Sequence, residues 1–275
     1  MRITLGYSPC PNDTFVFCGL VHGHIADAPE CEEVLADIET LNEMALQGQL
    51  DATKISFHAL AHLREEYCLL HSGGALGRGC GPLLVAREDL ALEDLKHKRI
   101  AIPGRLTTAA LLLRLFDPSI EQLAVMPFDQ IVGATAQGVV DAGVIIHESR
   151  FTYAQHGLAA IIDLGQWWEE STGHPIPLGG ILARRSLGAE LIGQLDRALV
   201  QSVEFAYAHP DAVRGYIRQH AQEMDESVMQ AHIDLYVNPH TFDYGADGEA
   251  AIFDLIERAE RAGIAPKSDA PLFIS

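Results

Sequence analysis

The side chains best suited to chemistry follow short apolar runs of the chain. "GVII" leads into His147, and "RIAIPG" leads, a few residues later, into Thr107 and Thr108. An imidazole with an ordinary pKa of about 6.5 can accept a proton near neutral pH. Hydroxyls at the start of a helix can cap that helix or bind an anion. His147 is therefore a candidate general base, and the adjacent Glu148 is expected to point to the opposite face of the strand.

Two earlier apolar runs deliver further polar side chains. "RITLGY" is followed by Ser8 and Asn12, and "DATKISF" contains Lys54 and Ser56. Lys54 and Ser56 share one face because side chains alternate along a strand. Each candidate also has a plainer interpretation. Threonine hydroxyls are common helix caps, lysines are usually solvated, and most histidines have no catalytic role.

The stretch "GYSPCPNDTFVF" marks the end of the first expected strand. Proline lacks an N–H and fixes φ, so Pro9 and Pro11 cannot lie in the middle of a paired strand. The residues of "NDT" (12–14) are types that cap helices. The stretch predicts a strand, a rigid turn and a helix start, with the turn presenting Ser8 and Asn12 to a ligand.

Short apolar runs alternate with longer helical patterns, which is typical of an α/β fold. "GPLLVAREDL" (81–90) is echoed by "GGILARRSLG" (179–188), and we interpret the two runs as strands by which the chain leaves one lobe and returns. The sequence therefore predicts a two-lobe α/β protein with a two-strand hinge and a C-terminal helical region. The larger lobe is expected at 1–88 and 182–275, the smaller inserted lobe at 89–181, and a ligand cleft between them.

Composition excludes several classes of function. The net charge is −19, from 38 acidic and 19 basic residues among 275, whereas nucleic-acid or acidic-membrane binding needs a basic surplus. No apolar run reaches the roughly 20 residues of a membrane span, and no signal-peptide pattern is present. Five cysteines without CxxC spacing offer no metal framework and suit a reducing compartment. We expect a cytoplasmic protein without nucleic-acid or membrane partners; the sequence indicates no oligomeric state.

Six strings occur in order from the first strand to the helical region: "SPCPNDTF", "TKISF", "GRLTTA", "IIHESRFTY", "DLGQWWEE" and "PLGGILARR". Together they resemble the 1,4-dihydroxy-6-naphthoate synthase family of the futalosine route to menaquinone. The resemblance implies a fold like that of the type II periplasmic solute-binding proteins. It also implies a lyase that converts cyclic dehypoxanthine futalosine to 1,4-dihydroxy-6-naphthoate, without a metal or a redox cofactor.

The same resemblance implies roles for individual residues. His147 would be the proton acceptor, and the segments 54–56, which includes Ile55, and 107–108 would contact the substrate. We expect Lys54 to pair with the carboxylate of a small-molecule substrate, because an ammonium group forms strong charge-assisted hydrogen bonds. The hydroxyls of Ser56 and of residues 107–108 can donate to carboxylate or sugar oxygens.

Two other functions stay open on the sequence alone. A non-catalytic solute-binding protein for a small carboxylate would share the lobes and the hinge, but the missing export signal counts against it. The chorismate dehydratase of the same pathway has a similar fold, and the string "IIHESRFTY" favours the synthase over it. Incubation with each candidate substrate distinguishes these functions.

Overall fold

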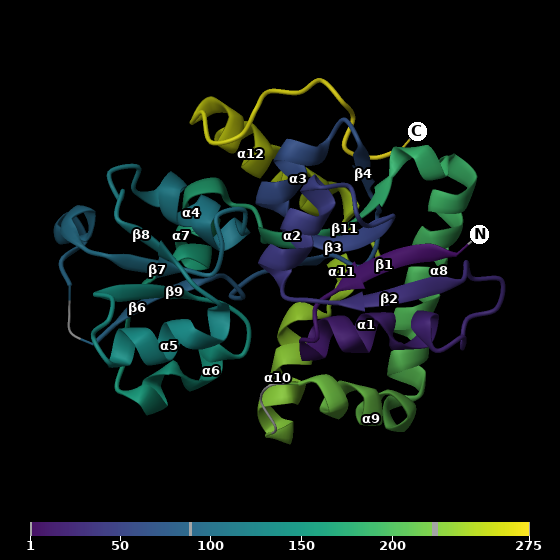
Figure 1. Ribbon diagram of the computed structural model, residues 1–275, viewed down its shortest axis with the longest axis horizontal. Helices are drawn as coiled ribbons and strands as arrows, with labels where there is room; N and C mark the ends of the chain where they lie inside the picture. Colours follow the sequence, from purple (N-terminus) through teal and green to yellow (C-terminus); the bar gives the residue numbers. More distant parts are fainter. Residues whose placement is uncertain (1, 88–89, 222–224, 275) are drawn as a thin grey trace.

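Two β-sheets organise the chain, one toward each end of the long axis of the molecule (Figure 1). The computed structural model describes residues 2–87, 90–221 and 225–274. The larger sheet has the order β2-β1-β3-β11-β4, with β5 paired to β11, and the smaller sheet has the order β10-β6-β9-β7-β8. The strands of the larger sheet are β1 (Ile3–Tyr7), β2 (Cys31–Leu35), β3 (Ala52–Ser56), β4 (Tyr67–Leu69), β5 (Ala75–Gly77) and β11 (Ile176–Arg184). Those of the smaller sheet are β6 (Leu83–Ala86), β7 (Ile100–Ile102), β8 (Leu123–Val125), β9 (Ala142–Ile145) and β10 (Ala159–Asp163).

Helices lie on both sides of each sheet (Figure 1). Around the smaller sheet these are α4 (Thr108–Phe116), α5 (Phe128–Ala136), α6 (Ser149–Thr152) and α7 (Leu164–Thr172). Around the larger sheet they are α1 (Pro11–Val21), α2 (Ile38–Leu46), α3 (Phe57–Leu63), α8 (Ala189–Ala208), α9 (Pro210–His220), α10 (Glu226–Tyr236), α11 (Pro239–Phe242) and α12 (Gly245–Arg261). The predicted α/β alternation and the helical region after residue 185 are confirmed. In the described ranges, no helix combines the length and the apolar character that a membrane crossing needs.

Strand direction places the ends of the central strands. β1 is parallel to β2 and β3, so the carboxyl ends of β1 and β3 lie at one edge of the larger sheet. β7 is parallel to β8 and β9, so their carboxyl ends likewise share one edge of the smaller sheet. Because ligands of open α/β sheets bind beyond the carboxyl ends of strands, these two edges locate the site.

The first helix begins earlier than the sequence predicted. Cys10 is the N-cap and Pro11 the first helical residue, so Asn12 and Asp13 lie inside the first turn instead of capping it. Proline suits this position because its φ is preset and its missing N–H would have no helical partner. The rigid turn is confirmed, and it turns Asn12 and Asp13 toward buried partners described below.

The chain crosses between the sheets at 78–82 and 173–175, and not at the echoed strands. β6, in the first echoed run, pairs with β9 and β10 in the smaller sheet, although the predicted larger lobe included it. β11, in the second run, pairs with β3, β4 and β5 in the larger sheet over its whole length, although residues 176–181 were expected in the smaller lobe. The predicted boundary at 88 and 89 itself lies outside the described residues. The two strands that flank the crossings are β5 and β11, and they pair with each other.

Two glycines pack backbone to backbone beside the first crossing. A Cβ added to Gly81 would lie 2.3 Å from the Cα of Gly165 in α7, a distance that real structures do not tolerate. We expect Gly81→Ala to lower the free energy of unfolding by about 1–3 kcal/mol, because main chain must move to admit the methyl group. Urea unfolding measures this change.

A glycine in open space provides the control. Gly215 lies in α9, and a Cβ there would meet nothing within 4 Å. Gly215→Ala is expected to raise stability by about 0.5–1 kcal/mol, because alanine loses less backbone freedom than glycine in a helix. Equal responses of the two variants would contradict the close approach at Gly81.

Candidate functional site

A pocket lies between the two sheets, beyond the carboxyl ends of β1, β3, β7 and β9. It brings together seven of the eight side chains that the sequence singled out, namely Ser8, Asn12, Lys54, Ser56, Thr107, Thr108 and His147. The other lining residues are Asp13, Ile38, Ala75, Cys80, Pro82, Ala109, Ile146, Leu178, Gly179 and Tyr236. The structure thus places the polar candidates around one mixed polar and apolar space, as small-molecule sites require. That they contact a substrate stays a prediction.

Ile55 is the exception. It is 1% exposed and its side chain lies in the hydrophobic core, while its neighbours Lys54 and Ser56 line the pocket. The strand alternation that puts 54 and 56 on one face puts 55 on the other. The Ile55 side chain therefore lies away from the pocket, and the expected contact of the 54–56 segment with the substrate stays a prediction.

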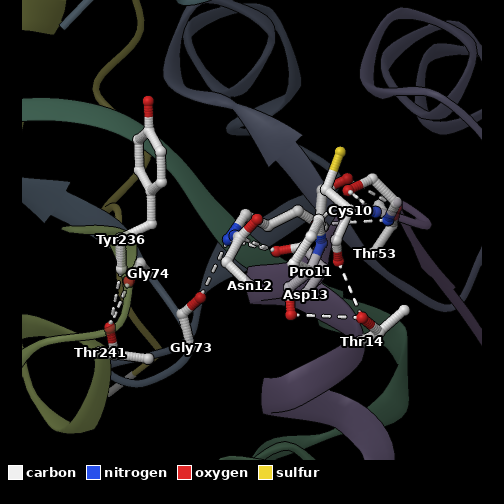
Figure 2. A network of polar contacts seen from close by, with 12 residues as sticks. Cys10, Pro11, Asn12, Asp13, Thr14, Thr53, Gly73, Gly74, Tyr236 and Thr241 are labelled. Atoms are coloured by element: carbon white, nitrogen blue, oxygen red, sulfur yellow. Dashed lines mark hydrogen bonds and ion pairs between the residues drawn. The ribbon is translucent and has the colours of Figure 1, made fainter. Parts of the chain in front are cut away.

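Lys54 is paired inside the protein. Its side chain is buried, with Nζ 3.2 Å from Asp13 Oδ1, and Nζ donates to the carbonyl oxygen of Gly73 at 3.1 Å. Figure 2 labels these two partners, Asp13 and Gly73. Asp13 also accepts hydrogen bonds from Ser8 Oγ at 2.7 Å and from Asn12 Nδ2 at 2.8 Å. The solvated interpretation of Lys54 is excluded. The lysine is held rigidly, and two of its three N–H groups are already used by these partners.

The start of α4 serves both as an ordinary cap and as a wall of the pocket. Thr107 Oγ1 accepts from the N–H of Ala110 at 3.2 Å and donates to Gly104 O at 2.9 Å. Thr108 Oγ1 donates to Leu178 O of β11 at 2.6 Å, which ties the smaller sheet's helix to the larger sheet. Both hydroxyl protons are thus engaged within the protein. A ligand here would meet the first-turn amides and the positive end of the helix dipole.

His147 stands just past the end of β9, half-buried in the pocket. Its backbone has the left-handed value φ 56°, which is uncommon for a residue other than glycine. The ring lies edge-on to Phe128, with ring centroids 5.0 Å apart. Burial lowers the pKa of His147, while the negative charges of Glu148 and Asp13 act in the opposite direction. The imidazole is therefore uncharged at neutral pH and able to accept a proton.

Glu148 does not point away from His147 as the alternation rule predicted. The side chain is 8% exposed, and one carboxylate oxygen lies within 4.8 Å of a ring nitrogen of His147. The rule fails because β9 ends at Ile145 and the left-handed turn at His147 redirects the next residue. No residue pattern predicted this turn, because a left-handed backbone is uncommon for residues other than glycine.

His232 is a second residue that the sequence did not single out. It lies on α10 with no exposed surface, and its Nε2 is 2.8 Å from Asn12 Oδ1. Its ring is nearly parallel to that of His147, with centroids 6.1 Å apart. The only signal was its position on the apolar face of "DESVMQAHIDLYV", three residues after the buried Met229. That pattern is equally typical of a core histidine.

One group of residues in the described chain could hold a metal ion. Cys10, His147 and Glu148 each offer a ligand atom, and these three atoms lie within 4.8 Å of one another. Burial raises the pKa of the Cys10 thiol well above its ordinary value, so the thiol is protonated and a poor ligand. The expectation of a reaction without a metal or redox cofactor stays a prediction.

His58 makes the stability of the site's wall depend on pH. It is 2% exposed, its Nδ1 lies 3.3 Å from Thr107 O, and burial lowers its pKa to about 4. In the unfolded chain its pKa is about 6.5, so the unfolded state binds the extra proton below that pH. Stability is therefore lost as the pH falls from about 6.5 toward 4, by roughly 3 kcal/mol from this group.

Replacing His58 by glutamine tests this linkage. Between pH 7 and 4.5, we expect the parent to lose about 2–3 kcal/mol more unfolding free energy than His58→Gln. Urea unfolding at both pH values measures the difference. Identical pH dependence in the two proteins would mean that His58 is not buried uncharged.

Comparisons with known proteins identify the family of the chain. Residues 3–261 match a family described as menaquinone biosynthesis. A 1,4-dihydroxy-6-naphthoate synthase of Thermus thermophilus is 52% identical over 273 residues, which cover 99% of both chains. The corresponding synthase of Streptomyces coelicolor is 48% identical over 269 residues, covering 96% of this chain and 95% of the other.

Solved structures add the fold. A crystal structure of a protein from Archaeoglobus fulgidus superposes with a TM-score of 0.90 at 38% identity, covering 96% of this chain and 98% of the other. The periplasmic aliphatic sulphonate-binding protein of Escherichia coli superposes with a TM-score of 0.65 at 12% identity, covering 97% and 89%, a likeness of fold alone. The predicted periplasmic-binding-protein-like α/β fold is confirmed. The family match covers most of the chain, and two synthases are 52% and 48% identical to it. The chain therefore belongs to the menaquinone biosynthesis family.

Proposed function

We propose that the chain is a lyase that converts cyclic dehypoxanthine futalosine to 1,4-dihydroxy-6-naphthoate with loss of the sugar-derived fragment, and that it acts in the cytoplasm. The observation that carries the proposal is an uncharged imidazole, His147, in a pocket that also holds a buried lysine and a helix start. The names of the two synthase relatives supply the product, and the resemblance carried by the six sequence strings supplies the substrate.

Proton removal from carbon is the step we assign to His147. The lowered pKa keeps the ring unprotonated at neutral pH, so no proton must leave it before reaction. The left-handed backbone and the contact with Phe128 hold the ring in one orientation. A base held in a fixed orientation near its target raises the rate, because the entropy of orienting it is already lost when the protein folds and is not lost again at each turnover.

Negative charge on the reacting molecule needs donors that are not already used. Lys54 keeps one N–H beyond those that Asp13 and Gly73 take. Ser56 Oγ accepts from Asn42 Nδ2 at 3.2 Å, which leaves its own proton to donate. With the first-turn amides of α4, these groups would bind the carboxylate and developing oxyanions. Thr107 and Thr108 act through the helix start and not through their hydroxyl protons.

The apolar part of the pocket suits a fused aromatic ring. Ile38, Ala109, Ile146 and Leu178 line it together with Tyr236. Apolar walls bind a ring by removing its surface from water, and they strengthen the polar contacts beside them. We assign the naphthalene-forming portion of the substrate to this side.

Incubation with two candidate substrates tests the proposal. The purified protein should form 1,4-dihydroxy-6-naphthoate, followed by its absorbance, from cyclic dehypoxanthine futalosine, and should leave chorismate unchanged. Loss of enolpyruvate from chorismate would instead support the dehydratase. Saturable binding of the cyclic compound without turnover would support a solute-binding protein.

A further inference from the structure

Two buried polar atoms face each other behind His147. Glu148 Oε2 and His232 Nδ1 are 4.0 Å apart, and neither has a hydrogen-bond partner among the described residues. Buried polar atoms without partners are costly and rare in native structures. Both residues lie beside the ring of His147. The ring centroids of His232 and His147 are 6.1 Å apart, and a carboxylate oxygen of Glu148 lies within 4.8 Å of a ring nitrogen of His147.

The hydrogen bonds around Asn12 determine which nitrogen of His232 carries the proton. Asp13 Oδ1 accepts from the amide nitrogen of Asn12, so the amide oxygen of Asn12 is the atom that meets His232 Nε2. That oxygen can only accept, so Nε2 must be the N–H. Burial lowers the pKa of His232 well below its ordinary value, so the ring is uncharged and carries one proton. Nδ1 therefore presents a lone pair.

The lone pair of Nδ1 faces an oxygen of Glu148, so two acceptors stand opposite each other with no proton between them. A proton that arrives at Glu148 would become a donor to His232 Nδ1 and satisfy both atoms. The pair would need to approach by about 1 Å to form an ordinary hydrogen bond. The carboxylate oxygen of Glu148 and Nδ1 of His232 can therefore share one additional proton.

We propose that Glu148 takes over the proton that His147 removes from the substrate, with His232 Nδ1 as the acceptor that holds it there. The step rests on the proposed function. A C–H bond of the substrate breaks, its proton passes to the free nitrogen of His147, and the electron pair of the bond stays on the substrate and drives the loss of the sugar-derived fragment. The proton then moves to the Glu148 carboxylate, directly or through one water, and His147 is again an uncharged base. Glu148 is a positioning residue that acts through His147.

The charges around His147 support this direction of transfer. The charged and titratable groups around it are Asp13 and Cys10 at the start of α1, Lys54 of β3, Asp37 before α2, His232 of α10 and Glu148. Among them Glu148 contributes most to raising the pKa of His147 against the effect of burial. Removing its charge should therefore lower that pKa and shift the acid limb of the kcat/KM profile to lower pH.

Glu148→Gln is the test, with Glu260→Gln as control. Glutamine keeps the shape but takes up no proton, so we expect kcat to fall about 10–100-fold with KM within about twofold. The thermal midpoint should stay equal or rise, because the amide can donate to His232 Nδ1 where the carboxylate cannot. Glu260 of α12 pairs with Arg64, the residue that caps the end of α3, and the Glu260→Gln variant should keep the parental kcat. Glu148→Asp retains the charge and should recover part of kcat with the parental acid limb.

The outcomes separate this proposal from the proposed function. If the parent does not turn over cyclic dehypoxanthine futalosine, the proposed function fails and the role of Glu148 fails with it. If the parent is active, a parental kcat, an unmoved acid limb or a loss confined to KM in Glu148→Gln would overturn the role of Glu148 alone. Should Glu148→Gln not fold, a Glu148→Asp variant whose acid limb moves to lower pH would overturn it instead.

Discussion

His147→Asn is expected to lower kcat by about 10²–10⁴-fold, the range that removal of a general base produces. Asparagine is the replacement of choice because, among residues with a side chain, it is one of those that best tolerate the left-handed backbone at this position, φ 56°. The thermal midpoint should therefore change little. KM should stay within about threefold, since the ring is assigned to the chemical step and not to binding. Steady-state formation of the naphthoate measures both constants.

His156→Asn is the matched control for this variant. His156 is exposed in the turn between α6 and β10, and we assign it no role in the pocket. It should keep the parental kcat and KM. A His147→Asn enzyme that retained parental turnover would remove the imidazole from the mechanism.

Lys54→Met is expected to affect folding and binding together. It leaves the Asp13 carboxylate buried without its counter-charge, which costs about 3–5 kcal/mol of unfolding free energy. It also removes the cation assigned to the substrate carboxylate, so KM should rise about 10–100-fold. Urea unfolding and steady-state kinetics measure the two effects.

The double variant Asp13→Asn with Lys54→Met separates them. The uncharged asparagine needs no counter-ion and its amide oxygen can still accept from Ser8, so most of the lost stability should return. The raised KM should persist. Recovery of KM along with stability would show that Lys54 acts only by neutralising Asp13.

The sequence identified much of the site because strand ends are a local feature. Lys54 and Ser56 alternate within β3, and His147 follows β9 directly, so a rule about strand ends finds them. Asp13 follows the first strand, but no local pattern predicts its pairing with Lys54, which depends on how α1 packs against the sheet. His232 lies on α10, far along the chain from the other site residues. No local sequence pattern can predict that residues so far apart in the chain lie side by side in the fold.

The fold shows the same difference between local and long-range features. The α/β class and most elements were predicted from apolar spacing, which is a property of each segment by itself. The pairing of the strands could not be predicted in this way. The echoed runs containing β6 and β11 look alike because both strands are buried, yet one pairs in each sheet. The strand β5, which precedes the first crossing, is only three residues long and lies in a glycine-rich stretch without the apolar spacing that predicts a strand.

A crystal structure of His147→Asn with cyclic dehypoxanthine futalosine bound tests the central claim most directly. The variant should hold the unreacted molecule between the two sheets, with its carboxylate near Lys54 and Ser56. The carbon that loses its proton should lie about 3–3.5 Å from the position that the ring nitrogen of His147 occupies in the parent. A substrate bound outside this pocket, or with no C–H group within reach of residue 147, would contradict the account.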